Sequence, residues 1–192
     1  MLLLVALTGL AAALSLGAVL VPQQAEANRS VANKAALAKR IVYEARLRRT
    51  LSAIHSVRNE TWRWQSVMSA PQSRYAASAE RSPSLAYRRS VLELWTHRVA
   101  QVRYTAQHLP RLKDWLCIHR YEGAWNDPNA PYYGGLQMDM SFQQAYGAAL
   151  LRSKGTADHW SPLEQIWVAE RAFRSGRGFY PWPNTARSCG LI

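Results

Sequence analysis

The sequence predicts a mainly α-helical protein that carries one short β-hairpin in its C-terminal half. Apolar residues recur every three or four positions over two long segments, which is typical of amphipathic helices. A stretch rich in Gly, Asn, Asp and Pro spans residues 122–137 and predicts a tight hairpin. Two capping boxes, which begin at Ser141 and Ser161, then predict the starts of two further helices.

The first long helix is expected over residues 31–58, which contain no Pro or Gly. A second is expected over residues 85–109, where Pro110 ends the pattern. Residues 62–83 are less regular because prolines interrupt them. In the second helix one set of residues recurs every three or four positions, and all but the first are apolar. This stripe comprises Arg88, Val91, Trp95, Val99, Val102, Ala106 and Leu109.

Three shorter helices are expected in the C-terminal part. One spans residues 111–121 and leads into the hairpin. The first capping box starts a helix that runs to about Leu151. The second has Pro162 at the first helical position and starts a helix that runs to about Arg174, with two glycines as stop signals after it.

Positive charge is concentrated in the middle of the chain, whose formal net charge is +12. Residues 28–116 contain 17 Lys and Arg against five Asp and Glu, whereas residues 117–192 contain seven against six. Basic segments attract nucleic acid, anionic lipid or anionic wall polymer. We therefore divide the chain into an N-terminal segment (1–27), a basic helical region (28–110) and a C-terminal domain (111–192).

The N-terminal segment has the features of an export signal. Leu2–Val21 is a nearly unbroken apolar run, and the A-x-A site at Ala25-Glu26-Ala27 predicts cleavage before Asn28. The run is also long enough to span a membrane, and no Lys or Arg precedes it, so an uncleaved anchor is the alternative. Both place the rest of the chain outside the cytoplasm, where nucleic acid is not an expected partner. The basic helices are then expected to contact anionic wall polymer or a membrane surface.

The two cysteines, Cys117 and Cys189, are expected to form a disulfide, because an even pair in an exported protein is typically bonded. The bond would brace most of the C-terminal domain, whose own core is small. Zinc is a poor alternative because no His or Cys lies at ligand spacing. We expect no metal and no other cofactor.

The stretch that begins at Glu122 has the residue types needed to cleave a glycoside. An acid must protonate the leaving oxygen, and a partly buried carboxyl group can stay protonated because burial disfavours its charged form. Glu122 ends a predicted helix, three residues before Trp125. Gly134 and Gly135 let a sugar approach the backbone closely, and Gln137 can hydrogen-bond an N-acetyl or hydroxyl group.

A second carboxylate is harder to assign. Asp139 is the best candidate and Asp127 the next, although Asp139 precedes Ser141, where an acid favours a helix N-terminus, and capping is the preferred interpretation. Without a second carboxylate the substrate's acetamido group could trap the oxocarbenium ion and give an anhydro product. Hydrolysis and this lytic route both stay open. Glu164 and Glu170 are interpreted as a helix-cap residue and a helix-surface residue.

Several motifs occur in the same order in a known family. Glu-Gly-Ala-Trp at 122–125, followed by Tyr-Tyr-Gly-Gly-Leu-Gln at 132–137, resembles the resuscitation-promoting factors. These are secreted transglycosylase-like proteins of high-GC Gram-positive bacteria with a compact lysozyme-like fold. Val168-Ala-Glu-Arg171, and Pro181-Trp-Pro followed by Cys189-Gly, resemble later parts of that family. The resemblance covers about residues 113–191 and implies a small lysozyme-like domain.

The resemblance implies that Glu122 is the catalytic acid and that the segment 132–137 is a strand lining the sugar cleft. The substrate-binding residues it implies are Trp125, Tyr132, Tyr133, Gly134, Gly135 and Gln137. The expected reaction is cleavage of the β-1,4 bond between N-acetylmuramic acid and N-acetylglucosamine, by a muramidase or a lytic transglycosylase. One alternative is an inactive peptidoglycan-binding module that recruits another wall enzyme. Another is a membrane-proximal adaptor that acts through its basic helices.

The sequence departs from the family pattern next to Glu122. In the family a cysteine directly precedes the catalytic glutamate, whereas Cys117 lies five positions before Glu122. The displacement is about one helical turn, so Cys117 still points to a similar face. His119 can influence the protonation of Glu122, but we interpret it as a helix-surface residue.

Overall fold

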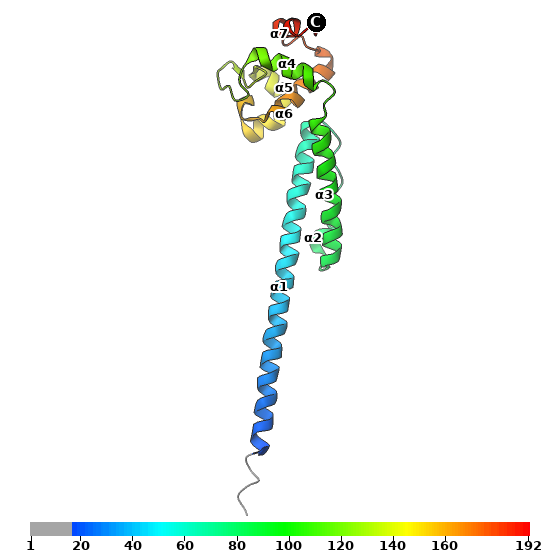
Figure 1. Ribbon diagram of the computed structural model, residues 1–192, viewed down its shortest axis with the longest axis vertical. Coiled ribbons are helices and arrows are strands. Elements are labelled where there is room, and N and C mark those ends of the chain that lie inside the picture. The colour runs from blue at the N-terminus through cyan, green and yellow to red at the C-terminus, as the bar shows by residue number, and fades with distance from the viewer. Residues whose placement is uncertain (1–16) are drawn as a thin grey trace, which may run out of the picture. The chain divides into compact units, whose positions relative to one another are not determined.

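The computed structural model describes residues 17–192, which are mainly α-helical, with seven α-helices and one short antiparallel hairpin (Figure 1). The chain divides into two compact units, residues 1–49 and 50–192. Helix α1 (Gly17–Val67) begins in the first unit and ends in the second. Most of the apolar run Leu2–Val21 lies outside the described residues. No helix within residues 17–192 is long and apolar enough to cross a membrane.

The described part of the first unit is a single helical segment. Every side chain from residue 23 to residue 43 is exposed, including Leu37 and Ile41 at more than half of their surface. The predicted helix over 31–58 is confirmed and is longer than expected at both ends. From residue 23 onward, the first fully buried residue of α1 is Ile54, in the second unit.

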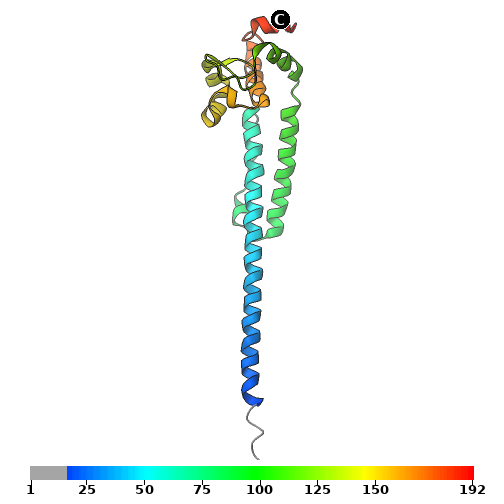
Figure 2. The same ribbon diagram turned by 60° about the vertical axis from the view of Figure 1, so that its left-hand side comes forward.

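In the second unit the last turns of α1 pair with α3 (Leu85–Gln107), and the two helices lie side by side in both Figure 1 and Figure 2. Trp62 of α1 meets Trp95 of α3 edge-on, with 6.0 Å between ring centroids. Arg103 donates two hydrogen bonds to the carboxylate of Glu60. The short helix α2 (Ser78–Arg81) precedes α3 in the chain. The predicted stripe of α3 is confirmed by its buried members Arg88, Trp95, Val99 and Ala106.

The hairpin follows α4 (Leu112–Glu122), as the sequence predicts. Strands β1 (Tyr132–Tyr133) and β2 (Met138–Asp139) are antiparallel and pair Tyr132 with Asp139. The strand expected over 132–137 is shorter than its motif, because residues 134–137 form the turn. Gln137 closes this turn with a φ of 47° and donates its backbone N–H to the carbonyl of Gly134.

The start of α5 (Met140–Lys154) corrects the prediction of a cap at Ser141. Asp139 is the N-cap, and its Oδ1 accepts the backbone N–H of Phe142 at 2.7 Å. Ser141 instead donates its hydroxyl to the same oxygen. An ionised carboxylate is a stronger acceptor than a hydroxyl and is favoured at a helix N-terminus, which explains why the aspartate takes the position.

The remaining elements are the short 3₁₀ turn η1 (Ala157–His159), α6 (Pro162–Ala172), the π-helical turn η2 (Phe173–Arg177) and α7 (Pro183–Ser188). The capping box at the start of α6 is confirmed: Ser161 accepts the backbone N–H of Glu164, and Glu164 accepts that of Ser161. The predicted disulfide is also present and links Cys117 of α4 to Cys189, which caps α7, with 6.0 Å between their Cα atoms.

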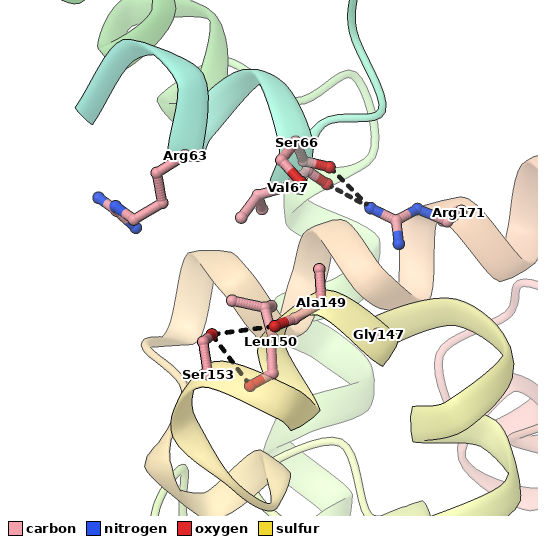
Figure 3. A pocket seen from close by; sticks show the side chains of 8 residues that line it. All are labelled: Arg63, Ser66, Val67, Gly147, Ala149, Leu150, Ser153 and Arg171. Carbon is pink, nitrogen blue, oxygen red and sulfur yellow. Dashed lines mark hydrogen bonds between the residues drawn. The ribbon is translucent and has the colours of Figure 1, made fainter. Parts of the chain in front are cut away.

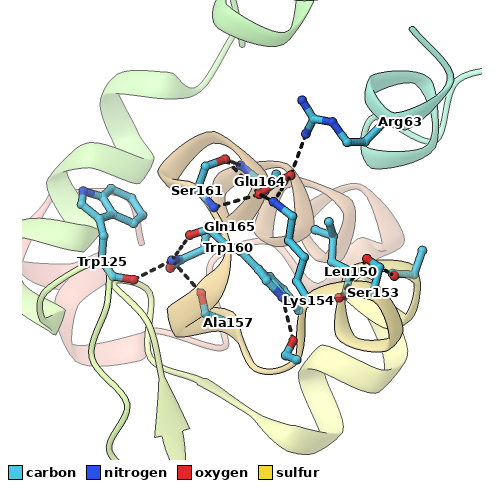
Figure 4. A network of polar contacts seen from close by, with 12 residues as sticks. Arg63, Trp125, Leu150, Ser153, Lys154, Ala157, Trp160, Ser161, Glu164 and Gln165 are labelled. Atoms are coloured by element: carbon cyan, nitrogen blue, oxygen red, sulfur yellow. Dashed lines mark hydrogen bonds and ion pairs between the residues drawn. The ribbon is translucent and has the colours of Figure 1, made fainter. Parts of the chain in front are cut away.

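Helix α6 carries two glutamates that are completely buried. Glu164 binds Arg63 of α1 and Lys154 of α5, each at 2.7 Å (Figure 4). Burial acts to raise the pKa of Glu164, but the hydrogen bonds from Lys154 and Ser161 outweigh it and hold the pKa below its ordinary value. The carboxylate thereby joins the end of α1 to α5 and α6.

Glu170 corrects the interpretation as a helix-surface residue. Its carboxylate accepts hydrogen bonds from Arg111, from Trp115 Nε1 at 3.0 Å and from Arg174 at 2.7 Å. Burial again acts to raise the pKa, and these hydrogen bonds more than compensate, so the pKa lies below its ordinary value. A buried charge is tolerated only when it is paired, and this one is paired on several sides.

Candidate functional site

Glu122 is the last residue of α4 and lies half-buried beside an open cavity of about 210 Å³. The helix ends there because Gly123 continues in an extended conformation. A Cβ atom at Gly123 would lie 3.0 Å from Gln137 Nε2, so a small residue suits this position. The other residues that line the cavity are Tyr132, Gln137, Pro181, Trp182, Pro183, Asn184 and Thr185.

The two oxygens of the Glu122 carboxyl group have different surroundings. Oε1 accepts a hydrogen bond from Thr185 Oγ1 at 2.8 Å. Among the residues that the structure describes, none hydrogen-bonds Oε2. One oxygen is therefore held in place, and the other is left without a hydrogen-bond partner among the described residues.

Two predicted substrate-binding residues, Tyr132 and Gln137, line the cavity together with Glu122. Tyr132 is about half exposed. Gln137 donates from Nε2 to Asp127 Oδ2 at 2.9 Å and to the carbonyl of Gly134 at 3.0 Å. These bonds fix the amide, and its Oε1 accepts no hydrogen bond from the described residues. That oxygen can accept an N–H or O–H group of a ligand.

Trp125 and Tyr133 do not line this cavity. The Trp125 ring stacks on His119 with 3.8 Å between centroids, and Tyr133 packs against the core. The interpretation of His119 as a surface residue is wrong, because it is half-buried and hydrogen-bonds the carbonyl of Gly135 through Nδ1 at 2.9 Å. His119 thus supports the hairpin.

The space in front of the paired glycines is filled by the protein's own side chains. A Cβ atom at Gly134 would lie 2.6 Å from Gln165 Oε1, and one at Gly135 would lie 2.6 Å from His119 Nδ1. Gln165 is buried, accepts the N–H of Gly135 and donates to the carbonyl of Trp125. No sequence motif indicated Gln165, which joins α6 to the hairpin turn and to the loop before β1.

Neither candidate for a second carboxylate lines the cavity. The backbone N–H of Phe142, followed by the Ser141 hydroxyl, lowers the pKa of Asp139 below its ordinary value, as expected for a cap. The backbone N–H of Asn129 and the Gln137 side chain likewise lower the pKa of Asp127. In the lining formed by the described residues, Glu122 is the one carboxyl group.

Thr185 and Asn184 are cavity-lining residues that no sequence motif indicated, and Trp182 was noted only as part of the Pro181-Trp-Pro motif. Trp182 is buried and donates from Nε1 to the carbonyl of Leu136 at 2.6 Å. A signal for Thr185 was present in the spacing of the cysteines. Thr185 lies one helical turn before Cys189, whose partner Cys117 lies just over one turn before Glu122.

A second cavity, of about 120 Å³, lies between the end of α1 and α5 (Figure 3). Its lining residues are Arg63, Ser66, Val67, Gly147, Ala149, Leu150, Ser153 and Arg171. Arg171 donates to the carbonyls of Ser66 and Val67 at the end of α1. This cavity contains no acid, whereas the first contains Glu122. Over residues 17–192, no three His, Cys, Asp or Glu residues converge as a metal site.

The chain matches no protein-family model and no curated protein. A functional assignment therefore depends on the geometry around Glu122 and on the motifs that carry the resemblance.

Proposed function

We propose that the protein is an exported peptidoglycan-cleaving glycosidase with a lysozyme-like C-terminal domain, in which Glu122 is the catalytic acid. The observation that carries the proposal is the half-buried carboxyl group beside an open cavity, with one oxygen held by Thr185 and the other unbonded among the described residues. A general acid needs this combination of fixed position and access.

The cavity lining suits an N-acetylated sugar. Pro181 and Pro183 offer apolar surface, and Tyr132 offers an exposed aromatic ring. Gln137 and Asn184 add amide groups that can pair with an acetamido or hydroxyl group. A few polar groups among apolar surface are typical of ligand sites.

In the proposed reaction Glu122 gives its proton to the glycosidic oxygen as the bond from that oxygen to the anomeric carbon of N-acetylmuramic acid breaks. The oxygen keeps the bonding electrons and leaves as a hydroxyl of N-acetylglucosamine. The anomeric carbon is left as an oxocarbenium-like centre that must be trapped. The carboxylate formed on Glu122 then accepts the proton of the group that completes the reaction.

We favour trapping by the substrate itself, because no second carboxylate lines the cavity in the described part of the chain. The acetamido oxygen would bond to the anomeric carbon, and the C6 hydroxyl of the same sugar would then displace it. The proton of that hydroxyl returns to Glu122, and the product is an anhydro sugar. Hydrolysis would instead add one water.

The proposed location is the cell wall, reached through the export signal or held by the membrane anchor. The segment 28–49 supports a role in adhesion, because it contains seven Lys and Arg against one Glu, and its side chains from 28 to 43 are all exposed. Anionic wall polymer or lipid headgroups are the proposed partners of this segment.

Digestion of purified peptidoglycan tests the proposal, with the released sugar ends identified by mass spectrometry. The mature protein should release fragments that end in anhydro-N-acetylmuramic acid, and Glu122→Gln should release about 10²–10⁴-fold less, because an amide cannot deliver the proton. Glu93→Gln, an exposed position on α3, is the matched control and should act as the parent does. If the mature protein binds peptidoglycan and releases nothing, the domain is a binding module instead.

A further inference from the structure

We propose that Thr185 is a positioning residue for Glu122, because its hydroxyl holds the same carboxyl oxygen before and after proton transfer; this inference rests on the proposed function. Thr185 Oγ1 lies 2.8 Å from Glu122 Oε1 and 3.2 Å from the backbone carbonyl of Trp182. A hydroxyl has one hydrogen to donate and two lone pairs that accept. It can therefore donate to only one of these two oxygens at a time.

Oε1 is the closer of the two acceptors, and it can accept the hydroxyl at each stage of the reaction. When Glu122 carries the transferable proton on Oε2, Oε1 is a carbonyl oxygen that accepts the Thr185 hydrogen bond. When the proton has passed to the glycosidic oxygen, Oε1 shares the negative charge and accepts the same hydrogen bond. A hydrogen bond to an ionised acceptor is stronger than one to a neutral acceptor, so Thr185 stabilises the carboxylate as it forms. No heavy atom has to move.

The position of Thr185 is fixed from two directions. Trp182 is buried, its indole N–H binds the Leu136 carbonyl, and its ring packs against Trp115 at 5.2 Å between centroids, which anchors the start of α7. One turn beyond Thr185, Cys189 donates its backbone N–H to the Thr185 carbonyl and is bonded through sulfur to α4. Thr185 thus lies between an aromatic anchor and a covalent one, opposite Glu122.

The arrangement also explains which oxygen acts. Thr185 holds Oε1, so Oε2 is the oxygen left to meet the glycosidic bond. A change of the Glu122 rotamer that moves the carboxyl group away from α7 would lose the Thr185 contact. The hydroxyl therefore selects one orientation of the acid, and a positioned acid reacts faster than a mobile one.

Two substitutions at this position test the inference on a soluble peptidoglycan tetrasaccharide. Thr185→Val keeps the shape and removes the hydroxyl, and Thr185→Ser keeps the hydroxyl and removes the methyl group. We expect Thr185→Val to lower kcat about 10- to 100-fold, the range for one hydrogen bond to a charged group, with KM unchanged. Thr185→Ser should recover most of the rate. Thr105→Val is the matched control, because Thr105 is exposed on α3 and its hydroxyl binds only the carbonyl of Gln101 in its own helix.

Wild-type kcat in Thr185→Val, or an equal loss in Thr185→Ser, would overturn the role of the hydroxyl. Folding is judged by thermal unfolding and disulfide content. If Thr185→Val fails to fold, Thr185→Ala takes its place, and its kcat is compared with that of Thr185→Ser. Glu122→Gln measured in parallel separates the two proposals. An inactive Glu122→Gln with a fully active Thr185→Val leaves the proposed function standing and removes Thr185 from it, whereas an active Glu122→Gln removes both.

Discussion

Glu170 in α6 is completely buried and accepts hydrogen bonds from Arg111, Trp115 and Arg174, whereas Glu122 at the end of α4 is half-buried and accepts one, from Thr185. A carboxylate surrounded by cations is locked in its charged form and can give no proton. A carboxyl group with one free oxygen beside a cavity is open to reaction. The difference indicates that Glu170 has a structural role in α6, whereas the edge between α4 and α7, where Glu122 and Thr185 lie, is the proposed active edge.

Loss of the disulfide should have the largest effect on stability and should also damage the active edge. The bond joins positions 72 residues apart, and the loop-entropy model gives a stabilisation on the order of 4 kcal/mol. Replacing Cys117 and Cys189 by Ser should lower the free energy of unfolding in urea by about that amount. It should also lower kcat, because α7 then loses one of its two anchors. Unchanged stability would show that packing alone holds α7 on α4.

Glu170→Gln should come next, with a loss of about 3 kcal/mol in the free energy of unfolding. This is the low end of the range for breaking a buried ion pair, because Arg111 and Arg174 keep partial access to water. Urea denaturation measures it, with Glu93→Gln as the exposed control. If both variants unfold alike, the buried network contributes no net stability. The activity per folded molecule of Glu170→Gln should stay close to that of the parent.

Acid should weaken the α6 network through the same carboxylates. The pKa values of Glu164 and Glu170 are lower in the folded protein than their ordinary values, so folding is favoured when both are ionised. Their contribution is present above the unfolded pKa of about 4.3 and is lost as pH falls through the lower folded values. Unfolding free energies measured from pH 7 down to pH 2 should therefore decline most below about pH 4. Glu170→Gln should show a shallower decline, and an identical slope would contradict the assignment.

Removal of residues 1–49 should have the smallest effect on stability. The described side chains from 23 to 43 are all exposed, and the second compact unit begins at Thr50. The shortened protein should unfold within about 0.5 kcal/mol of the mature chain, as is usual for changes at exposed positions. Its binding to whole walls should fall and lose salt dependence, because contacts made by exposed charges are screened over about 10 Å at 0.1 M salt. Retention of full, salt-sensitive binding would assign adhesion to the second unit.

A chain that begins at residue 111, the predicted start of the C-terminal domain, provides the contrast. It would lose the ion pair of Arg63 with Glu164 and the hydrogen bond from Trp167 Nε1 to the Ala106 carbonyl. It would also uncover the core where Trp64 and Val67 pack. We expect it to be clearly less stable than a chain that begins at Thr50. Equal stability would support a domain boundary near residue 110.

Much of the fold could be predicted because it depends on local chemistry. The stripe of α3, the capping box at Ser161 and the turn residues of the hairpin act through near neighbours in the chain, and each was predicted at or near its position. The disulfide was predicted from an even pair of cysteines in a chain that we expected to be exported. The cap of α5 was misassigned because Asp139 and Ser141 both suit an N-cap, and only the backbone geometry decides between them.

The candidate site could be predicted only in part, because its residues come from distant segments. Glu122, Tyr132 and Gln137 carry a motif that is visible in the sequence, and the structure brings them to one cavity. Thr185 hydrogen-bonds Glu122 although the two lie 63 positions apart in the chain. No pattern among the residues next to Thr185 indicates a role, and only the distant cysteine pair links the two segments. The buried environment of Glu170 was missed for the same reason, since Arg111 and Trp115 lie more than 50 positions away.

The most direct test of the division between α6 and the active edge is to measure turnover and stability on the same variants. Glu122→Gln and Glu170→Gln would each be assayed for kcat on a soluble peptidoglycan tetrasaccharide and for the free energy of unfolding in urea. We predict that Glu122→Gln loses about 10²–10⁴-fold in kcat while its stability stays within about 0.5 kcal/mol of the parent. We predict the reverse pattern for Glu170→Gln. A Glu122→Gln variant that retains most of the parent kcat would contradict the account, because Glu122 would then not be the acid.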